Sequence, residues 1–139
     1  MSLSNVPSSV PVLLEEVAAL LAALDGNDSR FDATHVCRLA SSPEALLAAY
    51  APGQPGSHWR GVDVIADWCV PEGSLGSFTT PVLRIAAEHD FVTPRSMRGW
   101  QQLAHQRLVV LPGVAHHALL ERPEIYGAPL EAFLRNHED

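Results

Sequence analysis

Two short apolar segments, each followed by a segment of helical character, constrain the fold of this 139-residue chain most strongly. Residues 82–87 (VLRIAA) and 108–111 (LVVL) lack the clear polar alternation of a half-exposed strand. Such runs are typical of strands that are covered on both faces of a parallel sheet. Helix-start signals predict a helix over residues 94–105 and another from Pro123. The order strand–helix–strand–helix therefore predicts an α/β fold with parallel strands and crossover connections.

The first half of the sequence is expected to be helical. Apolar side chains at i, i+3, i+4 and i+7 spacing predict one buried helix face that ends at Gly26. The members of this set are Val10, Leu13, Leu14, Val17, Leu20, Leu21 and Leu24. Further helices are predicted from Pro43 and over residues 58–68. Residues 31–39 fit either a short helix or irregular structure, and residues 71–77 are expected to form a linker.

Length, charge and cysteine content narrow the class of protein. The length fits one domain, and a formal net charge of −7 argues against nucleic-acid or anionic-membrane binding. No stretch reaches the roughly 20 apolar residues that cross a bilayer, and the N-terminus lacks the pattern of a secretory signal. Cys37 and Cys69 lack metal-ligand spacing, so we expect buried thiols in a reducing compartment. We therefore predict a cytoplasmic protein without a cofactor or metal ion.

An acidic residue and a histidine pair follow the two predicted strands. Asp90 comes shortly after the first strand, and His116 and His117 come shortly after the second. An acid and a histidine in this order fit two members of a nucleophile–histidine–acid triad. Adjacent histidines cannot both face one point, so only one of them would serve as the base. The alternatives are a turn-forming aspartate, a surface histidine pair, or Glu88 as the acid.

The third member of such a triad is missing from the sequence. No Gly-x-Ser-x-Gly turn, which would present a nucleophilic serine, occurs anywhere in the chain. Ser74 lies in the sequence EGSLG, which has glutamate at the first glycine position and no preceding strand. Neither cysteine has the context of an activated nucleophile. We therefore expect the nucleophile to lie outside this sequence or to be absent.

The second half resembles the C-terminal part of the α/β-hydrolases. Residues 80–94 (TPVLRIAAEHDFVTP) are similar to the penultimate strand and acid loop of that fold. Residues 107–124 (RLVVLPGVAHHALLERPE) are similar to its last strand and catalytic-histidine loop. The family usually has glycine before the histidine, whereas this chain has Ala115. Residues 11–28 and 66–68 resemble the helical lid of the proline iminopeptidase and tripeptidyl aminopeptidase branch.

The resemblance implies a division of the chain and a set of roles. Residues 1–75 would form a helical lid, and residues 76–139 would form the C-terminal part of the catalytic domain. Asp90 would be the triad acid and His116 the base, with His117 as its neighbour. The implied reaction is hydrolysis of an ester or an amide by a serine supplied from elsewhere. Two alternatives remain, which are a non-catalytic interaction module and an Asp–His general-base enzyme without a covalent intermediate.

The number of predicted strands also bears on partners. Two strands are fewer than the usual four to six of a sheet, and their edges would stay unpaired. We therefore expect self-association or a separate N-terminal hydrolase half to complete the sheet. The contact is predicted along the edge of residues 82–87 or that of residues 108–111.

Overall fold

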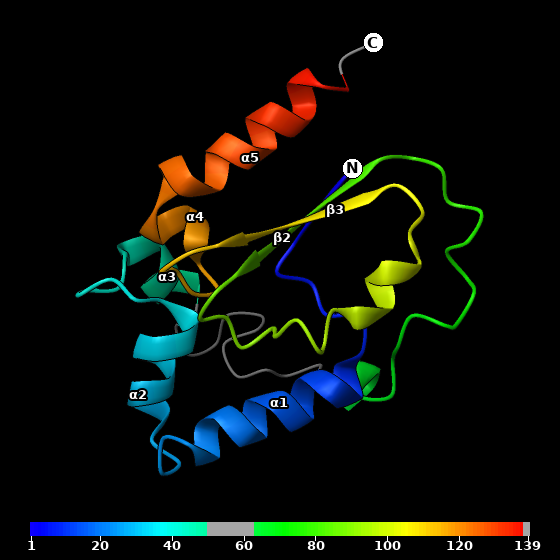
Figure 1. Ribbon diagram of the computed structural model, residues 1–139. Coiled ribbons are helices and arrows are strands. Elements are labelled where there is room, and N and C mark those ends of the chain that lie inside the picture. Colours follow the sequence, from blue (N-terminus) through cyan, green and yellow to red (C-terminus); the bar gives the residue numbers. More distant parts are fainter. Residues whose placement is uncertain (50–62, 138–139) are drawn as a thin grey trace.

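The computed structural model describes residues 1–49 and 63–137, and it is an α/β structure around a parallel sheet (Figure 1). Three strands pair in the order β1 (Ser2–Ser4), β2 (Val82–Ala87) and β3 (Gln106–Leu111), all parallel. The helices are α1 (Val10–Ala22), α2 (Asp28–Phe31), α3 (Glu44–Ala49), α4 (Ala118–Glu121) and α5 (Pro123–Arg135). A π-helix, η1 (Asp32–Val36), and two 3₁₀-helices, η2 (Asp63–Ile65) and η3 (Arg98–Gln102), complete the described elements. The predicted α/β class with parallel strands is confirmed.

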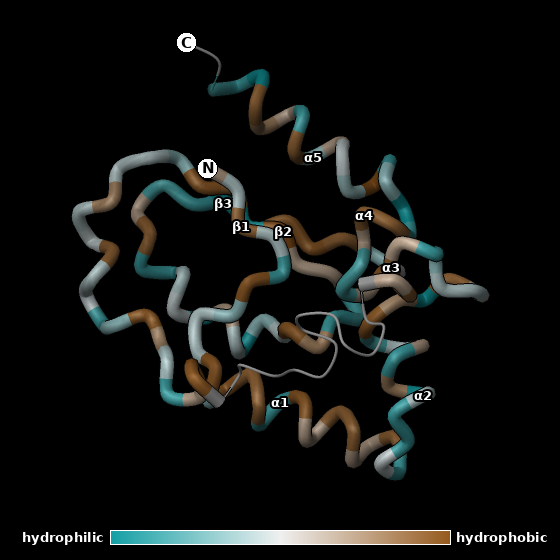
Figure 2. The backbone as a smooth tube through the Cα atoms, turned by 180° about the vertical axis from the view of Figure 1, so that it is seen from behind, coloured by the Kyte–Doolittle hydropathy of each residue, from teal (hydrophilic) through white to brown (hydrophobic). Residues whose placement is uncertain are grey.

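The sheet is covered on both faces, as the apolar sequence of β2 predicts. Helix α1 lies on one side of the strands, and α4 and α5 lie on the other (Figure 1). Ala86 of β2 packs into the core on the α1 side, whereas Leu83 and Ile85 pack against the side of α5. All six residues of β2 are buried, which makes this strand the centre of both cores. Figure 2 shows that much of α1 is apolar, and Leu13 on this helix lies in the core that contains Ala86.

A strand at the N-terminus was not predicted. Residues Ser2–Ser4 pair with β2, so β2 has a neighbour on each side and offers no free edge. The expected contact along residues 82–87 is therefore wrong. The outer edges of β1 and β3 have no strand partner among the described residues. The sheet remains short of the usual strand number.

The predicted helix over residues 94–105 is also wrong. Only η3 forms there, because the polar groups of the preceding turn are bonded to the segment before α1. Ser8 Oγ accepts the N–H of Gly99 at 2.8 Å and donates to the carbonyl of Ser96 at 2.8 Å. A Cβ at residue 99 would lie 2.9 Å from the Ser8 Cβ, so this close approach requires glycine. Tertiary contacts thus override a good local helix-start signal.

The remaining helix predictions agree with the structure in part. Helix α1 begins at Val10 with Ser9 as its cap, and Gly26 lies in the left-handed region at φ 70°. The predicted helix over residues 58–68 lies partly outside the described residues, and its described part contains only η2. The last helix begins at Pro123 as predicted. Within the described ranges, no helix combines the length and apolar character needed to cross a membrane.

Candidate functional site

The carboxyl ends of β2 and β3 bring Asp90 and His116 together. The imidazole Nδ1 of His116 lies 3.0 Å from Asp90 Oδ1 and 3.2 Å from Oδ2. These distances fall in the range expected for a hydrogen-bonded acid–histidine pair. The carboxylate of Asp90 is fully buried, whereas 24% of the His116 side chain is exposed. The acid is therefore shielded, and part of the imidazole remains accessible.

The acid is fixed by its own loop. Asp90 Oδ1 accepts a hydrogen bond of 2.8 Å from the N–H of Val92, two residues further on. The ring of the intervening Phe91 stacks on the imidazole of His116, with a centroid distance of 4.3 Å and an interplanar angle of 29°. The carboxylate and the imidazole are thus each held by a second contact besides their bond to one another. This limits the pair to one mutual orientation.

Two glutamates hold the loop that carries His116. The carboxylate of Glu121, in α4, accepts the buried N–H of Ala115 at 3.1 and 3.2 Å. Glu88 Oε2, at the end of β2, accepts the N–H of Gly113 at 2.7 Å. Glu88 therefore binds the main chain of the histidine loop, and no contact joins it to the His116 imidazole. Arg122, the neighbour of Glu121 in sequence, forms an ion pair with Glu124.

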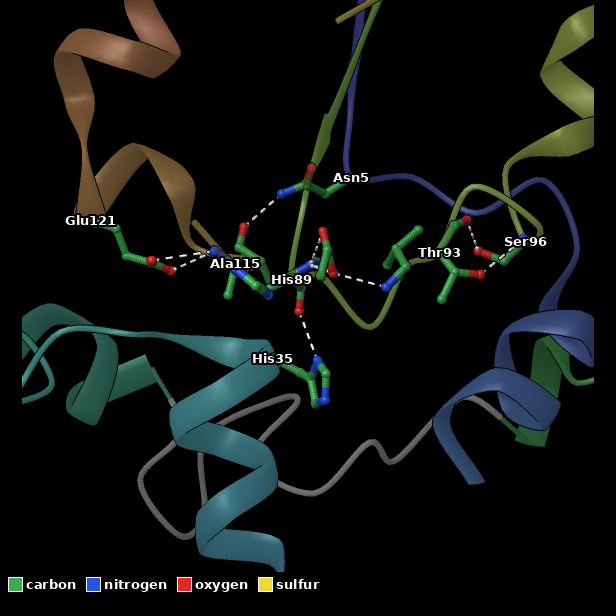
Figure 3. A network of polar contacts seen from close by, with 10 residues as sticks. Asn5, His35, His89, Thr93, Ser96, Ala115 and Glu121 are labelled. Carbon is green, nitrogen blue, oxygen red and sulfur yellow. Dashed lines mark hydrogen bonds and ion pairs between the residues drawn. The ribbon is translucent and has the colours of Figure 1, made fainter. Parts of the chain in front are cut away.

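Asn5, which follows β1, is a site residue that sequence reasoning missed. Its Nδ2 donates to the carbonyl of His116 at 2.6 Å, and its backbone adopts φ 51° (Figure 3). Asparagine tolerates this left-handed conformation better than most residues, and that tolerance is the only sequence signal of its position. The first strand is thereby linked directly to the main chain of the histidine.

His117 lies directly beside His116 in the histidine loop. The two rings meet edge to face at a centroid distance of 5.1 Å. Burial, and secondarily the neighbouring His116, hold the pKa of His117 below its usual value, while the Asp90 charge acts in the opposite direction. His117 is therefore biased toward the neutral form. The bond between His116 Nδ1 and the buried Asp90 carboxylate makes His116 the candidate base.

The pair has the chemistry of a general base. In the tautomer in which Nδ1–H donates to Asp90, the lone pair on Nε2 can take a proton from a nucleophile. Asp90 also stabilises the imidazolium that such a transfer forms. Among residues 1–49 and 63–137, no group of three or more His, Cys, Asp and Glu side chains is placed to hold a metal ion.

The other nucleophile candidates have ordinary surroundings. The hydroxyl of Ser74 donates to the carbonyl of Pro71 at 2.8 Å, within the exposed turn that follows β-bridge residue Cys69. Cys37 is buried, as expected, but Cys69 is exposed. Within residues 1–49 and 63–137, none of these three side chains is bonded to the Asp90–His116 pair.

The bond from Ala115 to Glu121 predicts a stability effect. Replacing Glu121 by alanine leaves a buried N–H without an acceptor, which costs about 1–3 kcal/mol in the free energy of unfolding. Glu121→Gln keeps an acceptor oxygen and should lose less. Urea denaturation of the full chain measures the effect, with the exposed Glu124→Ala as the matched control, which should change stability little. Equal losses for Glu121→Ala and Glu124→Ala would contradict this assignment.

The fold is similar to those of several solved structures. No protein-family model and no curated protein matches the sequence. Among solved structures, the chain is similar to VinJ, with TM-score 0.79 and 22% identity over 97% of this chain and 56% of VinJ. It is also similar to proline iminopeptidase from Mycobacterium smegmatis, with TM-score 0.76 and 28% identity over 98% of this chain and 57% of that enzyme.

A third similar structure is MGS-M2, described as an alpha/beta hydrolase enzyme from a deep-sea metagenome library of the Medee basin. Its TM-score is 0.55 and its identity 18%, over all of this chain and 57% of that one. The present chain therefore spans little more than half the length of each of these three structures.

Proposed function

Because the chain has a partial α/β-hydrolase fold, we propose that it supplies the acid and the base of a serine-type hydrolase. Asp90 is the acid and His116 the general base in this proposal. The single observation that carries it is the bond from His116 Nδ1 to the fully buried Asp90 carboxylate, at 3.0 Å. A buried carboxylate that orients a partly exposed imidazole is what a triad requires of these two members.

The proposed reaction is acyl transfer to water. His116 Nε2 takes the proton of a serine hydroxyl as the serine oxygen attacks the carbonyl carbon of an ester or amide. The resulting imidazolium gives that proton to the leaving alcohol or amine as the acyl–oxygen or acyl–nitrogen bond breaks. His116 Nε2 then takes a proton from water as the water oxygen attacks the acyl carbon. It gives that proton to the serine oxygen as the acyl–serine bond breaks, which releases the acid product. The similarity to proline iminopeptidase favours peptides and aminoacyl amides as substrates.

The proposal places the serine on a segment that these 139 residues do not contain. The sequence has no Gly-x-Ser-x-Gly turn, and the chain covers 56% and 57% of the first two similar structures. A parallel strand added to the free edge of β1 would end at the same edge of the sheet as Asn5 and His116. An elbow at the end of that strand would present its serine to the exposed part of the His116 ring. A strand added to the outer edge of β3 would instead lie on the far side of β2 from β1 and Asn5.

The test is to reunite the chain with such a segment. We expect the 139-residue chain alone to hydrolyse p-nitrophenyl esters no faster than a protein blank. Co-expression with an N-terminal α/β-hydrolase segment that carries a Gly-x-Ser-x-Gly turn should produce activity on esters and aminoacyl amides. The matched control replaces only the elbow serine by alanine, which leaves the assembly intact and removes the nucleophile.

Other outcomes would point to the alternative functions. Turnover by the isolated chain that survives His116→Ala would contradict the proposal. Turnover by the isolated chain that is lost with His116→Ala would favour an Asp–His general base acting without a serine. A well-formed assembly without turnover would favour a non-catalytic interaction module.

A further inference from the structure

The π-helix η1 ends against the loops that carry Asp90 and His116. It follows α2 directly, and the N–H of Cys37 closes its last turn by donating to the carbonyl of Asp32 at 2.9 Å. The last carbonyls of a helix have no partner within the helix. In η1, two of these carbonyls accept hydrogen bonds from outside the helix. The carbonyl of His35 accepts the N–H of His116 at 3.2 Å, and that of Val36 accepts the N–H of His117 at 3.0 Å.

The side chain of His35 reaches the other loop. Its Nδ1 donates to the carbonyl of His89, the residue before Asp90, at 2.7 Å (Figure 3). His35 therefore binds the histidine loop through its carbonyl and the acid loop through its imidazole. The Nδ1–H that this bond needs is present in one neutral tautomer and in the charged ring. Within the described residues, no other side chain has a recorded bond to the His89 carbonyl.

Aromatic contacts also connect the segment 31–36 to the ring of His116. Phe31, at the end of α2, is buried, and its ring lies 5.2 Å from that of His35 and 6.2 Å from that of Phe91. Phe91 is the residue that stacks on the His116 imidazole. The segment 31–36 thus supports both the main chain and the ring of the candidate base. π-Helical turns are rare and are found frequently at functional sites.

We propose that His35 is a positioning residue, which sets the distance between the acid loop and the histidine loop from a segment outside both. Its carbonyl and its imidazole both bind main-chain groups of the two loops, so it acts through the loop main chains. Its effect on turnover rests on the proposed function, whereas its effect on the geometry of the pair does not. The two effects are therefore measured separately.

The test compares His35→Leu with His35→Asn in the full 139-residue chain. Leucine removes the donor, and asparagine places an amide nitrogen near the position of the imidazole Nδ1. Hydrogen exchange of the His116 and His117 amides, with the His116 Nδ1–H resonance, reports whether the loops stay together. A hydrogen bond contributes about 0.5–1.5 kcal/mol, so His35→Leu should speed exchange roughly 2- to 10-fold. His35→Asn should restore slow exchange.

Controls separate positioning from a general loss of stability. His105 is an exposed histidine before β3, at the opposite end of the strands from the site, and His105→Leu should leave exchange at residues 116 and 117 unchanged. The amide of Ile85, in the fully buried centre of β2, should also keep its rate in His35→Leu. Unchanged exchange at residues 116 and 117, or equal acceleration at Ile85, would overturn the proposal.

The assembled enzyme provides the second readout. His35→Leu should lower kcat by roughly 2- to 10-fold, as for exchange, without changing KM. His35→Asn should restore kcat. A change in KM alone would contradict positioning and would indicate contact with substrate. If no variant of the assembly has turnover, the proposed function fails, while the exchange result on the isolated chain still decides the role of His35.

Discussion

We expect replacement of His116 by alanine to remove almost all turnover of the reunited enzyme, by on the order of 10⁶-fold in kcat. The members of a triad act as a unit, so losing the base costs about as much as losing the nucleophile. The residual rate would come from substrate binding and from the donors that stabilise the oxyanion. Steady-state kinetics on an aminoacyl ester measures the loss, and circular dichroism verifies that the variant remains folded.

Two histidine variants serve as controls for that experiment. His105→Ala removes an exposed ring at the opposite end of the strands and should leave kcat within a few-fold of the parent. His117→Ala removes the neighbouring ring, whose pKa is lowered mainly by burial. If His117→Ala rather than His116→Ala abolished turnover, the role of the base would pass to His117.

Asp90→Asn is expected to lower kcat by on the order of 10⁴-fold. Asp90 Oδ1 accepts the N–H of Val92 and lies 3.0 Å from His116 Nδ1, and Oδ2 lies 3.2 Å from the same nitrogen. An asparagine that keeps the Val92 bond has no charge and places its amide nitrogen at the position of Oδ2, where it presents a donor to Nδ1. The imidazole then favours the tautomer with its proton on Nε2, which cannot accept a proton from serine. The loss should therefore appear in kcat while the fold is retained, because the asparagine side chain has nearly the same shape.

Glu88→Gln is the matched change for Asp90→Asn, since it converts another carboxylate at the end of β2 to an amide. Its side-chain oxygen can still accept the N–H of Gly113, so we expect little change in kcat. A loss for Glu88→Gln that exceeds the loss for Asp90→Asn would reassign the acid to Glu88. Similar small losses for both would remove the argument for a triad.

The sequence predicted the candidate pair because the information is local. Residues 82–87 and 108–111 are apolar enough to indicate strands buried in a parallel sheet, and each is followed closely by its polar residue. Parallel neighbours end at the same edge, so Asp90 and His116 had to come near each other once the strands paired. Asp90 and His116 are only 26 residues apart in sequence, so their contact depends on the pairing of two neighbouring strands and on no distant segment.

The features that were missed depend on partners far away in the chain. β1 is three residues long, with two serines, and only its pairing with β2 makes it a strand. The helix expected after Thr93 is replaced by η3 because Ser8 takes the polar groups of Ser96 and Gly99. His35 and Asn5 act on the main chain of distant loops, and no residue pattern marks such a contact.

The N-terminal strand also has a consequence for the order of folding. The bond from the amino group of Met1 to Pro81 closes a separation of 80 residues, whereas the bond between Arg84 and Gln106 closes one of 22. Each doubling of a closed loop adds about 0.6 kcal/mol of lost chain entropy, so the β1–β2 pairing is entropically costlier by roughly 1 kcal/mol. The β2–β3 unit, with Asp90 and His116 at its end, can therefore collapse first. Asn5 reaches the carbonyl of His116 only afterwards, when the beginning of the chain closes onto a nucleus already formed by its end.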